Sequence, residues 1–192
     1  MPTFDLRGVR CAKYVNTNGT ISYSEHTAVG DAMTVSLELR YTEGRLYAES
    51  KLAEYKKLAT GGSISIGVKY IKDVAKKLMY GCTEKSRTVS SKSVKGNVYG
   101  AKDEAQYVGL AFYAPDVIDG VNKYSCMFIS KALFGPPSMS FQTKGETIAF
   151  NTPTTTGEFL PDDSTNAVLI EEAVVDTEAE AIAWVKAVLG ES

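Results

Sequence analysis

The chain has 192 residues, of which 44% are hydrophobic and 23% are charged, and its formal net charge is −2. A chain of this length and composition can bury a core without disulfides or metal, so we expect one compact domain over residues 1–192 and not a disordered chain. The charge is too close to neutral to hold nucleic acid by its phosphates, which argues against a dedicated nucleic-acid-binding protein.

Cysteine and histidine are too few and too scattered to indicate a metal centre. Cys11, Cys82 and Cys126 form no CxxC pair, and His26 is the only histidine. We therefore expect buried, reduced thiols, a structural or exposed histidine, and neither metal nor cofactor.

The N-terminal residues 1–7 lack the basic start and apolar core of a signal peptide. No segment is long and apolar enough to span a bilayer. We therefore expect synthesis and folding in a cytoplasm, without a membrane anchor.

The first part of the chain alternates apolar and polar residues, as half-buried strands do. Residues 9–15 and 20–23 form a predicted hairpin, because Asn18-Gly19 between them tolerates the positive φ of a tight turn. In the runs 33–41 and 63–70 every second residue is apolar, so each predicted strand has one apolar face and one wet face. The apolar face of the second run consists of Ile64, Ile66, Val68 and Tyr70.

Residues 42–62, between these two runs, are too polar for a core and are predicted to form a long inter-strand loop. They mix both signs of charge with a few apolar residues, which is typical of a surface that docks on another copy of the chain. An idle solvated loop is the alternative. The candidate inter-subunit contact residues are Glu43, Arg45, Leu46, Tyr47, Glu49, Lys51, Leu52, Glu54, Tyr55, Lys56 and Lys57.

A short helix is predicted over residues 73–80, and we expect it to plug one end of a sheet. Asp73 can cap it, and Gly81 can end it in the left-handed conformation. The polar stretch 83–104, rich in Ser, Lys and Gly, is predicted to be a loop or an exposed hairpin.

A central hairpin is predicted for residues 107–114 and 122–134, with a turn at Asp119-Gly120. The second of these strands carries apolar residues on both faces, so we expect both faces to be covered. Shorter strands are predicted over 138–143, 147–150, 154–159 and 167–175.

The C-terminal segment is predicted to be an amphipathic helix. Thr177 and Glu180 have the spacing of a capping box, and apolar residues follow at helical spacing up to Gly190. The fold class is therefore mainly β, an antiparallel β-sandwich or half-barrel with a short helix after the third or fourth strand and a C-terminal helix on a sheet.

Motifs that would indicate an enzyme are absent from the sequence. It contains no GxSxG, GxGxxG, GxxxxGK[ST] or HExxH motif. The adjacent carboxylates Asp162-Asp163 and Glu171-Glu172 fit solvated positions better than an acid/base pair, because neighbours on a strand point to opposite faces. The tyrosines are not interleaved with Arg and Lys as in a base-stacking surface. We therefore expect a protein without enzymatic activity.

Six stretches distributed along nearly the whole chain follow the pattern of a known family. They are residues 1–14, 32–47, 62–81, 106–113 (Gln-Tyr-Val-Gly-Leu-Ala-Phe-Tyr), 124–134 and 152–159. In order and in residue pattern they resemble the phage major tail proteins, the tail-tube subunits of siphovirus-like, long, non-contractile tails. Residues 83–104 and 161–166 depart from that pattern.

This resemblance implies a structural virion protein located in the tail. Six copies would form a hexameric ring, and rings would stack into a tube through which DNA passes to the host without tight binding. Tail-tip, tape-measure and tail-terminator proteins would be its partners, and the loop at 42–62 would reach a neighbouring subunit or ring.

Two other functions are compatible with the same sequence. The first is the tube protein of a bacterial contractile injection or secretion system, which genome neighbours would separate from a phage tail, since a tape-measure gene would favour the phage. The second is a small-ligand-binding β-barrel, whose aromatic-rich strands would line a pocket.

Overall fold

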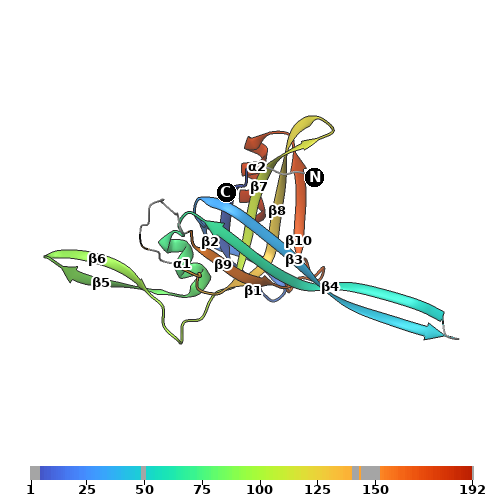
Figure 1. The fold of residues 1–192 in the computed structure, drawn as a ribbon, viewed down its shortest axis with the longest axis horizontal. Coiled ribbons are helices and arrows are strands. Elements are labelled where there is room, and N and C mark those ends of the chain that lie inside the picture. Colours follow the sequence, from blue (N-terminus) through green and yellow to red (C-terminus); the bar gives the residue numbers. More distant parts are fainter. Residues whose placement is uncertain (1–4, 49–50, 140–142, 144–151, 192) are drawn as a thin grey trace.

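The computed structural model describes residues 5–48, 51–139, 143 and 152–191, and the side chains of Ala48 and Leu52 are not described. Within these residues the protein is mainly antiparallel β with two helices, as predicted (Figure 1). The elements are β1 (Arg7–Thr17), β2 (Thr20–Ala28), β3 (Ala32–Ala48), β4 (Lys51–Val68), α1 (Asp73–Tyr80), β5 (Thr83–Val89), β6 (Lys92–Val98), β7 (Val108–Ile118), β8 (Val121–Phe134), β9 (Thr154–Phe159), β10 (Ile170–Val175) and α2 (Glu178–Val188).

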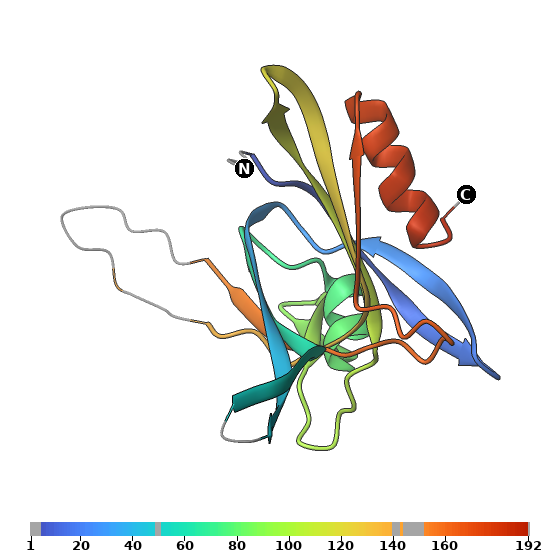
Figure 2. The ribbon, with the colours of Figure 1, turned by 90° about the vertical axis from the view of Figure 1, so that its right-hand side faces the viewer.

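One large sheet carries most of the strands, in the order β2-β1-β7-β8-β9-β4-β3. β8 pairs with β10 over Tyr124–Ile129 and with β9 over Ala132–Phe134, so the sheet forks along β8. The branch formed by β9, β4 and β3 crosses the face of β7 and β8, which gives the half-barrel shape (Figures 1 and 2).

The first hydrophobic core fills the inside of this curled sheet. Apolar side chains of β1, β4, β7, β8 and β9 meet there, and Ala75, Leu78 and Met79 of α1 close it. The expected plug role of the short helix is confirmed. Gly81 ends α1 in the left-handed conformation, as predicted, with φ 68°.

The second core lies on the outer face of β1, β7 and β8, beneath α2. Phe128 of β8 packs there with Ala181, Val185 and Leu189 of the helix, whereas its neighbour Ile129 points into the first core. Both faces of β8 are therefore covered, as predicted. Figure 2 shows α2 lying along this side of the sheet.

Local sequence signals set the turns and the helix start. Asn18 and Gly19 have φ of 53° and 85°, and Asp119 and Gly120 have φ of 52° and 78°, so both predicted tight turns are present. The Thr177 hydroxyl accepts from the Glu180 amide at 3.3 Å, and the Glu180 carboxylate accepts from the Thr177 amide at 2.9 Å. The predicted capping box is confirmed.

The prediction of a loop over 42–62 is wrong for the described residues, because β3 and β4 stay paired through it as far as Ala48 and Lys51. Both faces of this hairpin are solvated, so its sequence lacks the alternation of apolar and polar residues by which a half-buried strand is recognised.

The polar stretch 83–104 contains the β5–β6 hairpin, which is one of the two predicted alternatives. Tyr70, expected on an apolar face, is 46% exposed. Of the shorter strands, 154–159 is confirmed, whereas residues 140–142 of the predicted strand 138–143 and all of 147–150 lie outside the described residues.

Candidate functional site

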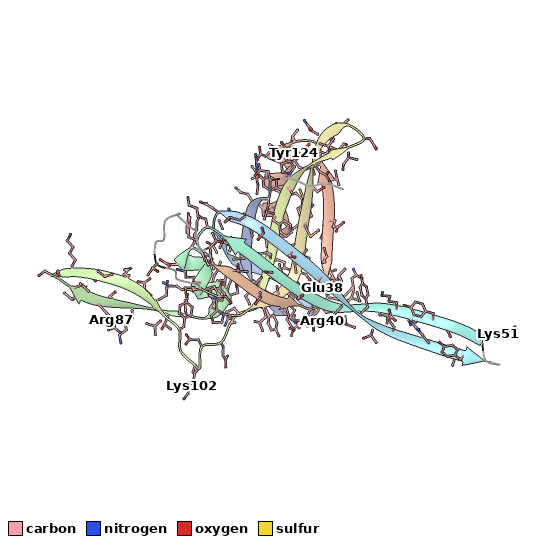
Figure 3. All side chains as sticks on the ribbon, viewed as in Figure 1. Glu38, Arg40, Lys51, Arg87, Lys102 and Tyr124 are labelled. Carbon is pink, nitrogen blue, oxygen red and sulfur yellow. The ribbon has the colours of Figure 1, made fainter. Side chains whose placement is uncertain are left out.

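Two hairpins leave the body of the molecule in opposite directions (Figure 1). We call residues 41–48 of β3 and 51–60 of β4 the long arm, and β5 with β6 the short arm. The long arm contains the residues predicted to contact a neighbouring subunit. In Figure 3 its side chains stand in open space between Arg40, at its base, and Lys51, near its tip.

The long arm begins where β4 loses its second neighbour. β9 pairs with β4 only from Gly62 to Gly67, so beyond Gly62 the hairpin consists of β3 and β4 alone. Thr60 is bulged out of the pairing, because Arg40 pairs with Gly61 while Tyr41 pairs with Ala59. Gly61 has φ 137°, and a Cβ there would lie 2.5 Å from the Phe159 carbonyl oxygen. Only glycine fits this exit point.

One face of the long arm is held together by charges and rings; we call it the charged face. It continues the side of β3 that faces the first core. Lys57 lies 3.3 Å from the Glu43 carboxylate and 4.3 Å from the Tyr41 ring centroid. Arg45 lies 3.4 Å from Glu43 and stacks over the Tyr55 ring at 5.6 Å. These groups bind one another across the two strands and so stiffen the hairpin.

Glu43 lies at the centre of this cluster. Hydrogen bonds from Tyr55 and Lys57, followed by the charges of Lys57 and Arg45, lower the pKa of its carboxyl below the ordinary value of 4.5. The carboxylate in turn raises the pKa of the Tyr55 hydroxyl, mainly through their hydrogen bond. The ionised form of Glu43 therefore favours the paired hairpin.

The other face of the long arm, which we call the leucine face, is different. Leu46 pairs with Glu54 and Leu58 with Thr42, while Lys56 stands opposite Gly44. The leucines are 59% and 54% exposed. Large apolar side chains on both strands of a projecting hairpin are suited to burial against a partner.

The structure separates the predicted contact residues into these two faces. Glu43, Arg45, Tyr55 and Lys57 are on the charged face, and Leu46, Glu54 and Lys56 are on the leucine face. Closer to the tip, Tyr47 pairs with Leu52 and Lys51 pairs with Ala48; Glu49 lies outside the described residues. The two faces arise because successive side chains of a strand point to opposite sides. A segment predicted as a loop gives no such assignment of residues to faces.

A groove of about 720 Å³ opens in the fork of the sheet, between β3 on one side and β10 with β7 and β8 on the other. We call it the fork groove. Its apolar lining includes Val35, Leu37, Phe112, Met127 and Val174, and its carboxylates are Asp5, Asp116 and Glu172. Sequence reasoning missed this groove, because it exists only where β8 pairs with two different strands.

The titratable and polar groups of the interior serve the fold. Asp116 accepts from the Ser125 hydroxyl at 2.9 Å, and His26 Nε2 donates to the Leu189 carbonyl at 2.6 Å. Cys11, Cys82 and Cys126 are free and buried, as predicted, and burial raises the pKa of the Cys11 thiol to about 12. Among the described residues no group of three or more His, Cys, Asp or Glu could hold a metal ion.

In the described part of the chain, no helix is long and apolar enough to cross a membrane. No protein-family model matches the sequence, and a search of curated proteins finds no significant match. The functional argument therefore depends on the residues themselves and on their geometry.

Proposed function

We propose that this protein is a structural virion protein, the major tail-tube subunit of a siphovirus-like phage, without enzymatic activity. Six copies form a ring, and rings stack into the tube through which DNA passes to the host. The observation that carries this proposal is the long arm, a stiffened hairpin that leaves the body and presents Leu46 and Leu58 to solvent.

A two-stranded hairpin is marginally stable in water without further contacts. The long arm has internal cross-links on its charged face, but its leucine face lacks a partner among the described residues of the same chain. Docking on a neighbouring subunit would bury this face and order the hairpin. A contact between two different surfaces is heterologous, so it generates rings or filaments instead of closed dimers.

The edges of the large sheet provide a second kind of contact. β2 and β3 are its outermost strands, and each has one backbone edge without a partner strand among the described residues. Pairing these edges between neighbours would close the six sheets into a continuous barrel and remove the exposed edges. The net charge of −2 supports passage of DNA along such a barrel, since a strongly basic protein would bind the phosphates.

The fork groove favours a second candidate function, the binding of a small ligand. Its volume of about 720 Å³ falls in the range of ligand pockets, and its lining is largely apolar. The first core, by contrast, is filled by side chains of the sheet and of α1.

Negative-stain electron microscopy of the concentrated protein, compared with a variant without the long arm, tests the proposal. In the variant, Asn-Gly replaces residues 43–57 and joins Thr42 to Leu58, which pair directly in the native hairpin. We expect hollow tubes from the native protein and none from the variant. In circular dichroism the variant should lose only the strand signal of the removed hairpin, and it should retain the native melting temperature, because the removed side chains lie outside both cores.

A native protein that stays monomeric at high concentration, or a variant that assembles equally well, would contradict the proposal. A monomer that retains a small molecule through purification would favour the ligand-binding alternative.

A further inference from the structure

The short arm, formed by β5 and β6, has two faces of different character. Its polar face is fixed to the body near the base of the hairpin. Glu84 lies 2.7 Å from Lys77 of α1 and 2.9 Å from Lys95, and Asn97 donates to Asp73 of α1 at 2.7 Å. These bonds orient the hairpin relative to the helix.

The opposite face, which we call the valine face, is apolar and basic. It presents Val89, Val94 and Val98, which are 55%, 51% and 41% exposed. The cross-strand pairing puts Lys85, Arg87 and Lys92 on the same face. Within the described chain, the salt bridges of this hairpin all involve Glu84, so these three cations remain available.

Every residue of β5, and all of β6 except the half-buried Asn97, is exposed. The hairpin of two seven-residue strands extends about 23 Å, far enough to reach another molecule. Figure 3 shows Arg87 on this projecting element, at the opposite end of the molecule from the long arm. Because the three valines of this face are exposed, they add little to the stability of the isolated chain. The fold of a single copy therefore gives no reason for them.

The fork groove has the complementary character. Met127 and Val174 give it an apolar wall, and no lysine or arginine occurs among the described residues that line it. Glu172 is exposed on β10, and Asp116 is 2% exposed with only hydrogen bonds from Ser125 and from the Val117 amide.

Two cations lie near this groove, and carboxylates engage both of them. Arg7 bonds to Asp5 and to Glu178 at 2.8 Å, and Lys123 bonds to Asp176 at 2.8 Å. Among the described residues, Glu172 forms no ion pair, so its exposed carboxylate beside the apolar wall remains available to a cation of another molecule.

We propose that the valine face of the short arm of one copy docks in the fork groove of a second copy. The valines meet the wall formed by Met127 and Val174, and Arg87 pairs with Glu172. This inference rests on the proposed function only in requiring self-association. It adds a contact that is distinct from the long arm and that defines the direction in which one subunit follows the next.

The contact is heterologous, because the short arm and the fork groove are different surfaces of the chain. The arm projects away from the groove of its own chain, beyond α1, so a second copy has to supply the groove (Figure 1). Charge complementarity selects this occupant over a neutral peptide, since Val89 and Val94 pair directly with Lys92 and Arg87.

Cysteine cross-linking between two variants tests the contact directly. A Val94→Cys chain is mixed with a mass-tagged Val174→Cys chain under oxidised glutathione, and the disulfide-linked heterodimer is quantified. The matched control replaces Val94→Cys by Ser93→Cys, which puts the thiol on the polar face of the same strand. The native thiols are buried, and Cys126, which lines the fork groove, is replaced by serine in every chain so that it cannot compete for the new thiol.

We expect roughly tenfold more heterodimer from Val94→Cys than from Ser93→Cys, in line with about one order of magnitude in local affinity. Adding Arg87→Glu should abolish this excess, and combining it with Glu172→Arg on the other chain should restore it. Equal yields for the two positions, or no rescue by the charge exchange, would overturn the inference.

The cross-link and electron microscopy distinguish this inference from the proposed function. Tubes without the selective cross-link would overturn the short-arm contact and leave the tail-tube proposal in place. A selective cross-link without tubes would support the contact and argue against the tail-tube function.

Discussion

Single side chains decide how rigid the long arm is. Glu43 receives hydrogen bonds from Tyr55 and Lys57, and Arg45 and Lys57 supply the nearby positive charge. Exposed ion pairs of this kind contribute little one at a time, but here three partners converge on one carboxylate. The ionisation state of Glu43 should therefore control the order of the hairpin.

Acidification is expected to loosen the long arm. The pKa of the Glu43 carboxyl is lower in the folded hairpin than the ordinary value of 4.5 that it has in the unfolded chain. The ionised carboxylate therefore stabilises the hairpin at pH values above 4.5. This stabilisation is lost as the pH falls through the lowered pKa. NMR spectra of the arm amides between pH 6 and pH 3 measure this change.

Glu43→Gln should remove most of this pH dependence at the arm. Glu54→Gln is the matched control, because it removes a carboxylate from the leucine face of the same hairpin. If the arm amides of the native protein and of Glu43→Gln change equally with pH, another group controls the arm.

At the scale of elements, the two arms obey the same rule. Each is a two-stranded hairpin with one face that is bonded internally or to the body and one face that lacks a partner. The long arm binds its charges on one face and exposes leucines on the other. The short arm fixes its polar face to α1 and exposes valines. Under the proposed function, these apolar faces are the ones that dock on another copy.

Substitutions on the leucine face should impair assembly without changing the fold. Burying a leucine contributes roughly 1.5–3 kcal/mol, so Leu46→Ser with Leu58→Ser should raise the concentration needed for assembly by at least about a hundredfold. Light scattering against protein concentration measures this threshold.

Arg45→Gln on the charged face is the control for that experiment, because it alters the arm without touching either leucine. We expect it to raise the threshold far less. An equal effect of both variants would mean that the arm acts through its stiffness and not through its leucine face.

At the scale of the whole molecule, the two cores are joined by shared strands. β7 and β8 contribute side chains to both, and Phe128 and Ile129 enter opposite cores from adjacent positions. Loss of one core should therefore expose the other, and unfolding should be a single cooperative transition.

The only tryptophan, Trp184, packs against the second core, so its fluorescence reports on that core while circular dichroism follows the whole sheet. Phe128→Ala should lower the free energy of unfolding by about 3–5 kcal/mol, with coincident urea transitions for both signals. Val89→Ala on the short arm is the control and should change stability by less than about 0.5 kcal/mol. Separated transitions in Phe128→Ala would show that the two cores unfold independently.

The sequence predicted most elements correctly, because their signals are local. Asn18-Gly19 and Asp119-Gly120 make tight turns wherever they occur between strands, and the Thr177–Glu180 pair starts a helix by itself. The apolar residues on both faces of β8 also predicted correctly that both faces are covered. The composition of residues 42–62 led to the prediction that they contact a partner, but it could not show that they form a paired hairpin.

The sequence by itself therefore determined the class of fold, the turns and the helices, whereas contact of residues 42–62 with a partner stays a prediction. Only the tertiary structure decided that residues 41–48 and 51–60 form a paired arm with two distinct faces, and that a groove opens in the fork. Pairing of β8 with both β9 and β10 joins segments far apart in the chain, as in Ala132↔Phe159, 27 residues apart, and Ile129↔Ile170, 41 residues apart. The arm likewise depends on a bulge at Thr60 and on where β9 ends. No local pattern encodes such long-range choices, because they follow from which strands meet when the cores are buried.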